Sequence, residues 1–466
     1  MLVKPQIGLI LVRADWTERR ELQPMLERLR QDAVQIASQL SQQFDVQGPW
    51  VVESNQTLAA CQHALREVEL DLVLLAFQTW AEDTRLVSLL QSLGGCPLVV
   101  WCYQPWRRAP RPMEMEEVLR GSGPVGALAA LGTLRNLGAP FLFTYGAPDD
   151  PRLLNDLTVA GRAAQVRRAL RAARIGLLPS RNEQMQVNFV DEFRLMADFG
   201  PVVQYLSVSE YRRVVDALAK VRVEAYLEQL RSRFEIQEVC DATLLRASQA
   251  ALGLAHLAVD YRLDVLAIND TSVELQRAFG MRPGLYPGLL DPLPVLFQPE
   301  GDLAAATANF ILHRLTGSAT MLIEIWFWDE AKNRVIGGHA GVQNPALAEA
   351  GQVWISPDYE YRLSNETEGA QFQMVARTGR VTLFQLRSGP KGWQAVAVSA
   401  MCLEGQPWVR GYPHAVLRLD APVSVFLERL AELGASQHWI MAYGSVLPEI
   451  RALCAMLGAP LEVITS

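Results

Sequence analysis

Two carboxylates flank a glycine in the segment Glu300-Gly301-Asp302, just before an Ala-rich stretch with helical spacing, residues 303–315. Carboxylates at a helix start accept hydrogen bonds from the free backbone N–H groups of the first turn, so helix capping explains them without any chemistry. Carboxylates are also oxygen ligands for divalent cations and carriers of protons. The segment is therefore a candidate site with two interpretations.

A third carboxylate, Glu324, lies in the otherwise apolar run Thr320-Met-Leu-Ile-Glu-Ile-Trp-Phe-Trp328. The run predicts a β-strand, and an unpaired carboxylate inside it would be costly to bury. Buried carboxylates are usually paired or bound to metal, whereas the exposed face of an edge strand would also accommodate this one. We take Glu324 as a second candidate for chemistry.

Two of the six histidines fall at ends of predicted strands in the same part of the chain. His339 follows a strand-like run in Ile336-Gly-Gly-His-Ala-Gly341, and His438 precedes another at residues 439–443. A single histidine is more often structural than a ligand. Carboxylates combined with imidazoles nevertheless suit Mn²⁺ or a similar divalent ion better than a closed thiolate zinc site.

The composition limits the classes of partner and compartment. The chain has 466 residues and a net charge of −7, so it gains nothing from a phosphate backbone, and we expect no nucleic-acid partner. We see no signal peptide and no apolar run of membrane-spanning length, which predicts a cytoplasmic protein without membrane contact. The cysteines form no Cys-x-x-Cys pair and predict free thiols in a reducing compartment: Cys61, Cys96, Cys102, Cys240, Cys402 and Cys454.

The elements that must position these residues follow from hydrophobic periodicity. Strand-length apolar runs alternate with helical patterns through the first two thirds of the chain, which predicts two α/β domains with doubly wound parallel sheets. From about residue 316 the runs predict a mostly antiparallel β domain with helices at 423–433 and 446–457. We expect domains at residues 1–171, 172–314 and 315–466, the last completing the metal site.

Another motif, Gly121-Ser-Gly-Pro-Val-Gly126, matches the Gly-x-Gly-x-x-Gly fingerprint of dinucleotide sites and opens a helical stretch. The fingerprint requires a preceding strand, whereas residues 113–120 are charged and helix-like. We interpret the motif as a turn and helix start rather than a dinucleotide site, and nicotinamide binding would test the alternative.

The order of these motifs resembles the L-fucose/L-arabinose isomerase family. In that family a Glu-Gly-Asp segment precedes a helix and a Thr-Gly turn, then a strand carries a second acidic residue and a histidine ends the next strand. This chain has Glu300-Gly-Asp302, Thr316-Gly317, Glu324 and His339 in that order, and later Pro413-His414 and Gln437-His438. Residues 123–128, 137–146 and 173–178 also resemble the family, so that nearly the whole chain is covered.

The resemblance implies a metal-dependent aldose–ketose isomerase working through a cis-enediol. Glu300, Glu324 and His438 would hold Mn²⁺ or another divalent ion, and the two glutamates would also form the acid–base pair. His339 would lie near the metal or the substrate, which leaves open whether it is a ligand, and Asn269 and Arg410 are further possible substrate contacts. The resemblance also implies a homo-oligomer, a trimer or hexamer.

Two departures leave the substrate open. The second acidic residue is Asp in some members and Glu here, and a stretch that often holds a Cys near the substrate begins here with Asn269-Asp-Thr-Ser. One alternative is therefore an isomerase of a sulfonated or phosphorylated sugar, for which a basic side chain such as Arg410 would be needed. The other is a sugar-binding descendant of the fold without turnover.

Overall fold

A computed structural model describes residues 4–16, 19–360, 368–405 and 407–465. The chain divides into two compact units, Met1–Arg168 with Pro448–Gly458, and Ala169–Leu447 with Ala459–Ser466. The second and third predicted domains thus share one unit, apart from the short segment near the C-terminus. In the described part of the chain, no helix combines the length and the apolar character needed to cross a membrane.

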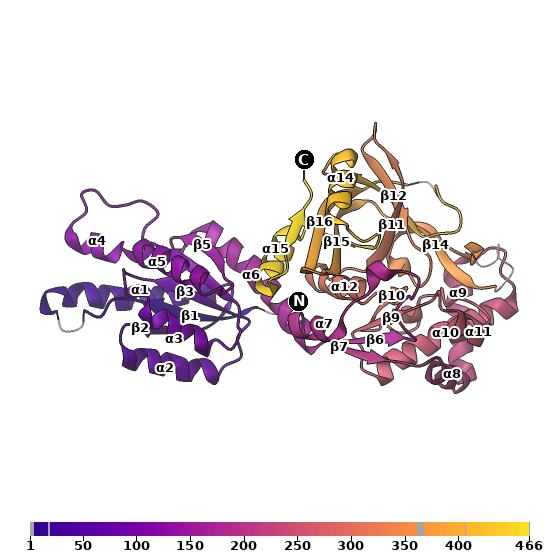
Figure 1. The fold of residues 1–466 in the computed structure, drawn as a ribbon, viewed down its shortest axis with the longest axis horizontal. Helices are drawn as coiled ribbons and strands as arrows, with labels where there is room; N and C mark the ends of the chain where they lie inside the picture. The colour runs from indigo at the N-terminus through magenta and orange to yellow at the C-terminus, as the bar shows by residue number, and fades with distance from the viewer. Residues whose placement is uncertain (1–3, 17–18, 361–367, 406, 466) are drawn as a thin grey trace. The chain divides into compact units, whose positions relative to one another are not determined.

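The first unit is built on a five-stranded parallel sheet in the order β2-β1-β3-β4-β5 (Figure 1). Its strands are β1 (Gln6–Val12), β2 (Asp45–Val52), β3 (Leu72–Phe77), β4 (Leu98–Tyr103) and β5 (Leu142–Gly146). The helices are α1 (Gln23–Ser41), α2 (Asn55–Arg66), α3 (Thr84–Ser92), α4 (Met115–Arg120), α5 (Gly123–Asn136), α6 (Pro151–Ala172) and α15 (Leu447–Leu457). Every residue of β3 is buried, as a strand covered on both faces requires. Strand β2 was not predicted because Gly48-Pro49 interrupts its pattern.

The second unit begins with a four-stranded parallel sheet in the order β10-β9-β6-β7. Its strands are β6 (Arg174–Leu178), β7 (Val202–Tyr205), β9 (Val265–Ile268) and β10 (Leu296–Pro299). The covering helices are α7 (Glu192–Asp198), α8 (Val208–Asp216), α9 (Lys220–Arg233), α10 (Asp241–Asp260) and α11 (Val273–Phe279). The carboxyl ends of β6, β9 and β10 lie side by side, which is the edge at which α/β sheets carry their sites.

The remaining strands form the predicted antiparallel β domain. A ladder in the order β16-β15-β18-β11-β12-β17 is closed by a further pairing of β16 with β17, which makes a six-stranded barrel. These strands are β11 (Thr320–Asp329), β12 (Arg334–Gly338), β15 (Gly379–Gly389), β16 (Gly392–Cys402), β17 (His414–Leu419) and β18 (Trp439–Tyr443). The sheet is extended by β19 (Leu461–Val463), β14 (Ala370–Ala376), β13 (Ala348–Pro357) and β8 (Glu235–Ile236), and α14 (Val423–Leu433) packs on it. The predicted fold class is confirmed.

Helix α12 (Leu303–Thr316) joins the two halves of the second unit. It packs against β15 and β18 of the barrel and against β9 and β10 of the parallel sheet, and Figure 1 shows it between them. This double contact explains why residues 303–312 are all buried, since the Ala-rich sequence allows close approach on both sides. The start of α12 is therefore held where the parallel sheet meets the barrel.

Candidate metal centre

Strand register brings the predicted residues of the barrel together. Glu324 of β11 pairs with Gly338 at the end of β12, directly before His339. On the other side of β11, Ile323 pairs with Trp439 of β18, so that continuing this antiparallel register places His438 opposite Glu324. Met321 and Ile323 fill the barrel core, and the alternation of side chains turns Glu324 to the outer face.

Glu300 comes from the parallel sheet. It follows β10 directly and has a φ of +66°, and Gly301 follows with a φ of +61°. Two consecutive left-handed residues turn the chain sharply before α12, at a steric cost for a residue with a side chain. A Cβ on Gly301 would lie 2.6 Å from the carbonyl oxygen of Ser180, so only glycine fits this turn.

Glu300 thus meets both histidines in a buried cluster. Its Oε1 lies 3.4 Å from Nε2 of His339, and its Oε2 lies 3.0 Å from Nε2 of His438. The two imidazole rings are nearly perpendicular, with centroids 5.8 Å apart. The three side chains offer ligand atoms within 4.8 Å of one another, a separation that suits a single metal ion.

The hydrogen-bond partners of the histidines indicate which ring nitrogens are free. Nδ1 of His339 lies 2.8 Å from the carbonyl oxygen of Ala340, which can only accept, so this nitrogen carries the proton. Nδ1 of His438 likewise faces Oδ2 of Asp302 at 2.9 Å. In the neutral imidazoles both Nε2 lone pairs then point at the Glu300 carboxylate, and acceptors facing acceptors need a cation between them.

The electrostatics agree with a site that attracts positive charge. Burial would lower the pKa of His438, but contact with the Asp302 and Glu300 carboxylates outweighs it and raises the pKa to about 10. Burial also opposes the charged form of Glu300, yet the two imidazoles hold its pKa well below the usual range. In the protein without metal, a proton thus occupies the place that the geometry offers to a divalent ion.

Asp302 makes contacts that correspond to both interpretations that the sequence left open. Its Oδ1 accepts the backbone N–H of Ala305 at 2.9 Å and caps α12, while its Oδ2 binds Nδ1 of His438. A carboxylate behind a ligating histidine fixes the ring orientation and raises the basicity of the free nitrogen. The donor set of one carboxylate and two imidazoles fits Mn²⁺ or a similar divalent ion, whose identity the residues leave open.

Glu324 lies at the accessible side of this cluster. Its Oε1 is 3.6 Å from Nε2 of His438, and its side chain is 28% exposed, against 8% for Glu300. The group of side chains that could hold a metal ion therefore consists of Glu300, His339 and His438, with Glu324 next to it. The predicted ligand set of Glu300, Glu324 and His438 remains a prediction to be tested.

The other predicted contacts have separate positions. Asn269 is fully buried, and its Nδ2 donates to the carbonyl oxygen of Arg181 at 3.2 Å and to Glu183 at 3.1 Å, so it holds the loop after β6. Arg410 pairs with Glu238 at 2.8 Å and its guanidinium lies over Tyr359, with 75% of its side chain exposed. Among the described residues, Arg410 contacts Glu238 and Tyr359 and not the cluster, so its role as a substrate contact stays a prediction.

A basic residue that the sequence did not single out, Arg181, has its backbone beside the turn that carries Glu300. The Cα of Arg181 is 3.3 Å from the position of a Cβ on Gly301, and its guanidinium lies 4.2 Å from the ring centroid of Phe189. The neighbouring Asn188 places its Nδ2 3.4 Å from Nδ1 of His438. Within the described chain, no carboxylate forms an ion pair with Arg181. Only tertiary structure could identify it, because nothing in its local sequence marks it.

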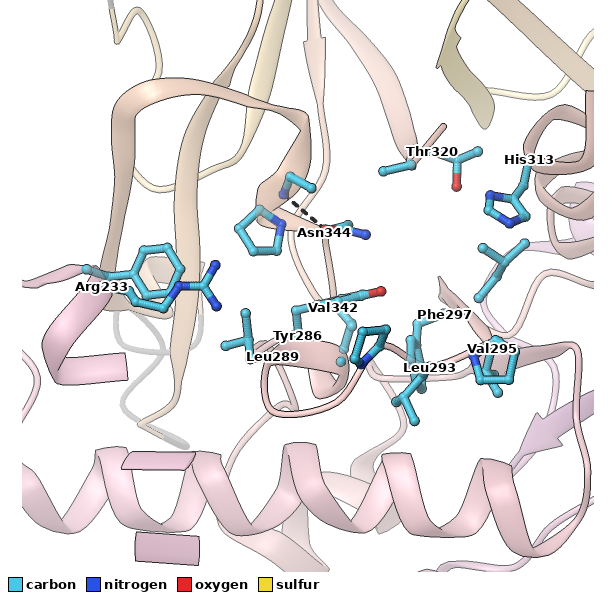
Figure 2. Close-up of a pocket in the computed structure, with 18 residues that line it drawn as sticks. Arg233, Tyr286, Leu289, Leu293, Val295, Phe297, His313, Thr320, Val342 and Asn344 are labelled. Atoms are coloured by element: carbon cyan, nitrogen blue, oxygen red, sulfur yellow. Dashed lines mark hydrogen bonds between the residues drawn. The ribbon is translucent and has the colours of Figure 1, made fainter. Parts of the chain in front are cut away.

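A cavity of about 470 Å³ lies in the same unit, near the amino end of β10 (Figure 2). Its walls are mainly apolar, and His313 and Thr320 line one end. None of Glu300, Glu324, His339 or His438 lines it, since Glu300 follows the opposite end of β10. This cavity is therefore separate from the candidate metal centre.

Comparison with known proteins supports an isomerase. No protein-family model matches the chain. The sulfoquinovose isomerase of Priestia megaterium is 22% identical over 418 residues, which cover 89% of this chain and 90% of the relative. That of Alkalicoccus urumqiensis is 21% identical over 386 residues, 82% of this chain and 84% of the relative. These relatives confirm the prediction of a sugar isomerase, while membership of the L-fucose/L-arabinose isomerase family stays a prediction.

Proposed function

We propose that this chain is a divalent-metal-dependent aldose–ketose isomerase whose substrate is a sulfonated sugar. The observation that carries the metal dependence is the pair of Nε2 atoms directed at the two oxygens of Glu300. The relatives, which are named for sulfoquinovose, support the sulfonated substrate.

Glu300, His339 and His438 would hold the ion, and Asp302 would orient His438 from behind. A divalent ion in this place supplies Lewis acidity to the carbonyl and hydroxyl oxygens of the sugar. Because Glu300 contacts both imidazoles and is 8% exposed, its carboxylate is committed to the ligand set. We therefore assign it no proton transfer from carbon.

Glu324 is the better placed base, since its carboxylate is 28% exposed and has room to meet substrate. It would remove the proton from C2 of the aldose, leaving the electron pair in the C1–C2 bond of an enediol. The carbonyl oxygen on C1 gains a proton as the C2 hydroxyl loses one, and Glu324 returns its proton to C1. Proton transfer by a placed carboxylate contributes about 10²- to 10⁴-fold to such rates.

Arg181 supplies the cation that a sulfonate needs. Its backbone lies beside the turn that carries Glu300, and its guanidinium lies over the Phe189 ring with no ionic partner among the described carboxylates. A guanidinium presents paired N–H donors that match the oxygens of a sulfonate, as they do those of a phosphate or carboxylate. The substrate would then bind with its reacting carbons at Glu324 and its anionic end at Arg181.

The test is conversion of sulfoquinovose to its 2-ketose by the purified protein with Mn²⁺, followed by NMR in D₂O. We expect turnover that stops with EDTA and returns with Mn²⁺, and deuterium at C1 in those turnovers in which the proton on Glu324 exchanges with D₂O before its return. The variant Glu324→Gln should lose at least about 10²-fold in kcat while keeping Mn²⁺ affinity. Equal turnover after metal removal would refute the metal dependence.

The substrate assignment has its own control. Arg181→Met should raise KM for sulfoquinovose about 10-fold or more with little change in kcat, because it removes a charge-assisted contact distant from the reacting carbons. Arg410→Met, which removes an exposed arginine that is paired elsewhere, should leave KM unchanged. The opposite pattern would move the anion contact to Arg410. If the protein binds the sugar but shows no turnover with any divalent metal ion, that result would favour the sugar-binding alternative.

A further inference from the structure

One buried carboxylate beside the candidate metal centre has no role in the chemistry above. Asp270 follows β9 by two residues and is 1% exposed. It lies between the segment that carries Glu300 and the loop that carries His339, and it contacts both, one with each carboxylate oxygen. Its place in the fold therefore joins the parallel sheet to the barrel.

The first oxygen fixes the backbone of Glu300. Oδ1 of Asp270 accepts the backbone N–H of Glu300 at 2.9 Å. Glu300 is the residue with a φ of +66°, a conformation that residues with a Cβ rarely adopt. A left-handed residue persists only where surrounding contacts hold it, and this hydrogen bond is such a contact.

The second oxygen limits the approach of the His339 loop. A Cβ on Gly341 would lie 2.5 Å from Oδ2 of Asp270, so the glycine itself packs closely against this oxygen. Gly341 follows His339 by two residues and has a φ of +79°. A side chain of another length at position 270 would therefore change the distance between the two segments.

A buried positive charge makes the carboxylate tolerable at this place. Arg282 is 3% exposed, binds Asp358 through two contacts of 2.7 Å, and carries a charge that acts on Asp270. Burial raises the pKa of Asp270 to about 6, and the charge of Arg282 opposes that rise. The carboxylate is thus retained in the interior with a compensating charge nearby.

We propose that Asp270 is a positioning residue that sets the separation of Glu300 from His339 and thereby the affinity of the centre for a divalent ion. The inference rests on the proposed metal centre, but it concerns the residue behind the ligands. Partners behind ligating residues typically contribute about 10- to 100-fold to metal affinity.

The experiment measures Mn²⁺ affinity by calorimetry on the full chain. Asp270→Ala should weaken binding about 10- to 100-fold, because Glu300 loses the contact that holds its backbone. Asp270→Asn keeps an oxygen acceptor of the same reach and should stay within about threefold of the unmodified protein. The matched control is Asp264→Ala, which removes the acceptor for the N–H of Arg174 at 2.9 Å at the other end of β9. It should leave Mn²⁺ affinity unchanged.

A second pair of variants keeps the test decisive if Asp270→Ala does not fold. Gly341→Ala adds a methyl against Oδ2, whereas Gly317→Ala adds one at a φ of +67° where no atom lies within 4 Å. Both variants introduce backbone strain, because each places a side chain at a positive φ. Only Gly341→Ala also adds a contact with Asp270, so only Gly341→Ala should weaken Mn²⁺ binding.

The outcomes are separable. Unchanged affinity in Asp270→Ala and Gly341→Ala, with tight binding by the unmodified protein, would overturn the role of Asp270. Equal losses in Asp264→Ala or Gly317→Ala would also overturn it, because they would show a general effect of destabilisation. No Mn²⁺ binding by the unmodified protein would instead refute the proposed metal centre itself.

Discussion

The carboxyl ends of the two parallel sheets carry similar sequence features with different consequences. In the first sheet a glycine motif opens α5, and a Cβ on Gly126 would lie 2.6 Å from the Phe77 ring. In the second sheet Glu300-Gly301-Asp302 opens α12 beside the barrel histidines. The first set of glycines lets a helix pack on its sheet, whereas the second turn directs a carboxylate at two imidazoles. A motif at a strand end becomes a site only when another element supplies the complementary groups.

Substitution of Glu300 should produce the largest difference between the two sheets. Glu300→Gln replaces one ligand oxygen by an amide nitrogen that cannot bind a cation, so we expect Mn²⁺ affinity to fall by more than about 100-fold. Turnover should fall with it. Calorimetry and the NMR assay measure both, and near-normal Mn²⁺ binding would show that the ligands lie elsewhere.

Asp302 separates capping from metal chemistry. Asp302→Ala should lower Mn²⁺ affinity about 10- to 100-fold and also lower the free energy of unfolding by about 1 kcal/mol, because it removes both the partner of His438 and the α12 cap.

Asp191→Ala is the control for the cap alone, since Asp191 accepts the N–H of Arg194 at 3.1 Å at the start of α7. It should cost similar stability without changing Mn²⁺ affinity. If both variants bind the ion equally, Asp302 is only a cap.

The pH dependence of Mn²⁺ affinity tests whether His438 takes part in metal binding. The folded pKa of His438 is raised to about 10, so at neutral pH the ion must displace its proton. Apparent Mn²⁺ affinity should therefore rise about tenfold per pH unit between pH 6.5 and 8.5, with proton release detected by calorimetry in buffers of different ionisation enthalpy. In the metal-free protein the same proton stabilises the fold fully below pH 6.5, and that contribution is lost as pH rises through 10. A flat profile would contradict this linkage.

The smallest effect is expected in the first sheet. Gly126→Ala forces a methyl against Phe77 and should lower the free energy of unfolding by about 1–3 kcal/mol through overpacking. Mn²⁺ affinity and KM should not change. Chemical denaturation measures the first, and a change in metal binding would connect this motif to the site after all.

Much of the architecture was predictable because buried strands and helices place apolar residues at regular spacings along the sequence. The runs at 72–77 and 439–443 coincide with β3 and β18, and the helix at 423–433 with α14. Among the strands that were not predicted, β10 has only four residues, and β2 is interrupted by Gly48-Pro49. Neither leaves a pattern that differs from a loop.

The site was predictable in part for a similar reason. Glu324 in an apolar run and Glu300 beside Asp302 stand out as residue types, so the sequence could nominate them. Arg181 and Asp270 carry no such local signal, since exposed arginines and turn aspartates are ordinary. Their importance comes only from what lies next to them.

The sequence by itself predicted most of the elements, nominated the carboxylates and histidines, and through a family resemblance predicted the class of enzyme. The tertiary structure decided which of them meet, because strand register and the double packing of α12 bring together residues more than one hundred positions apart, such as Asp302 and His438. It also decided that Asp302 both caps a helix and orients a histidine. These contacts depend on the precise distances between segments that are far apart in the sequence, which local periodicity does not encode.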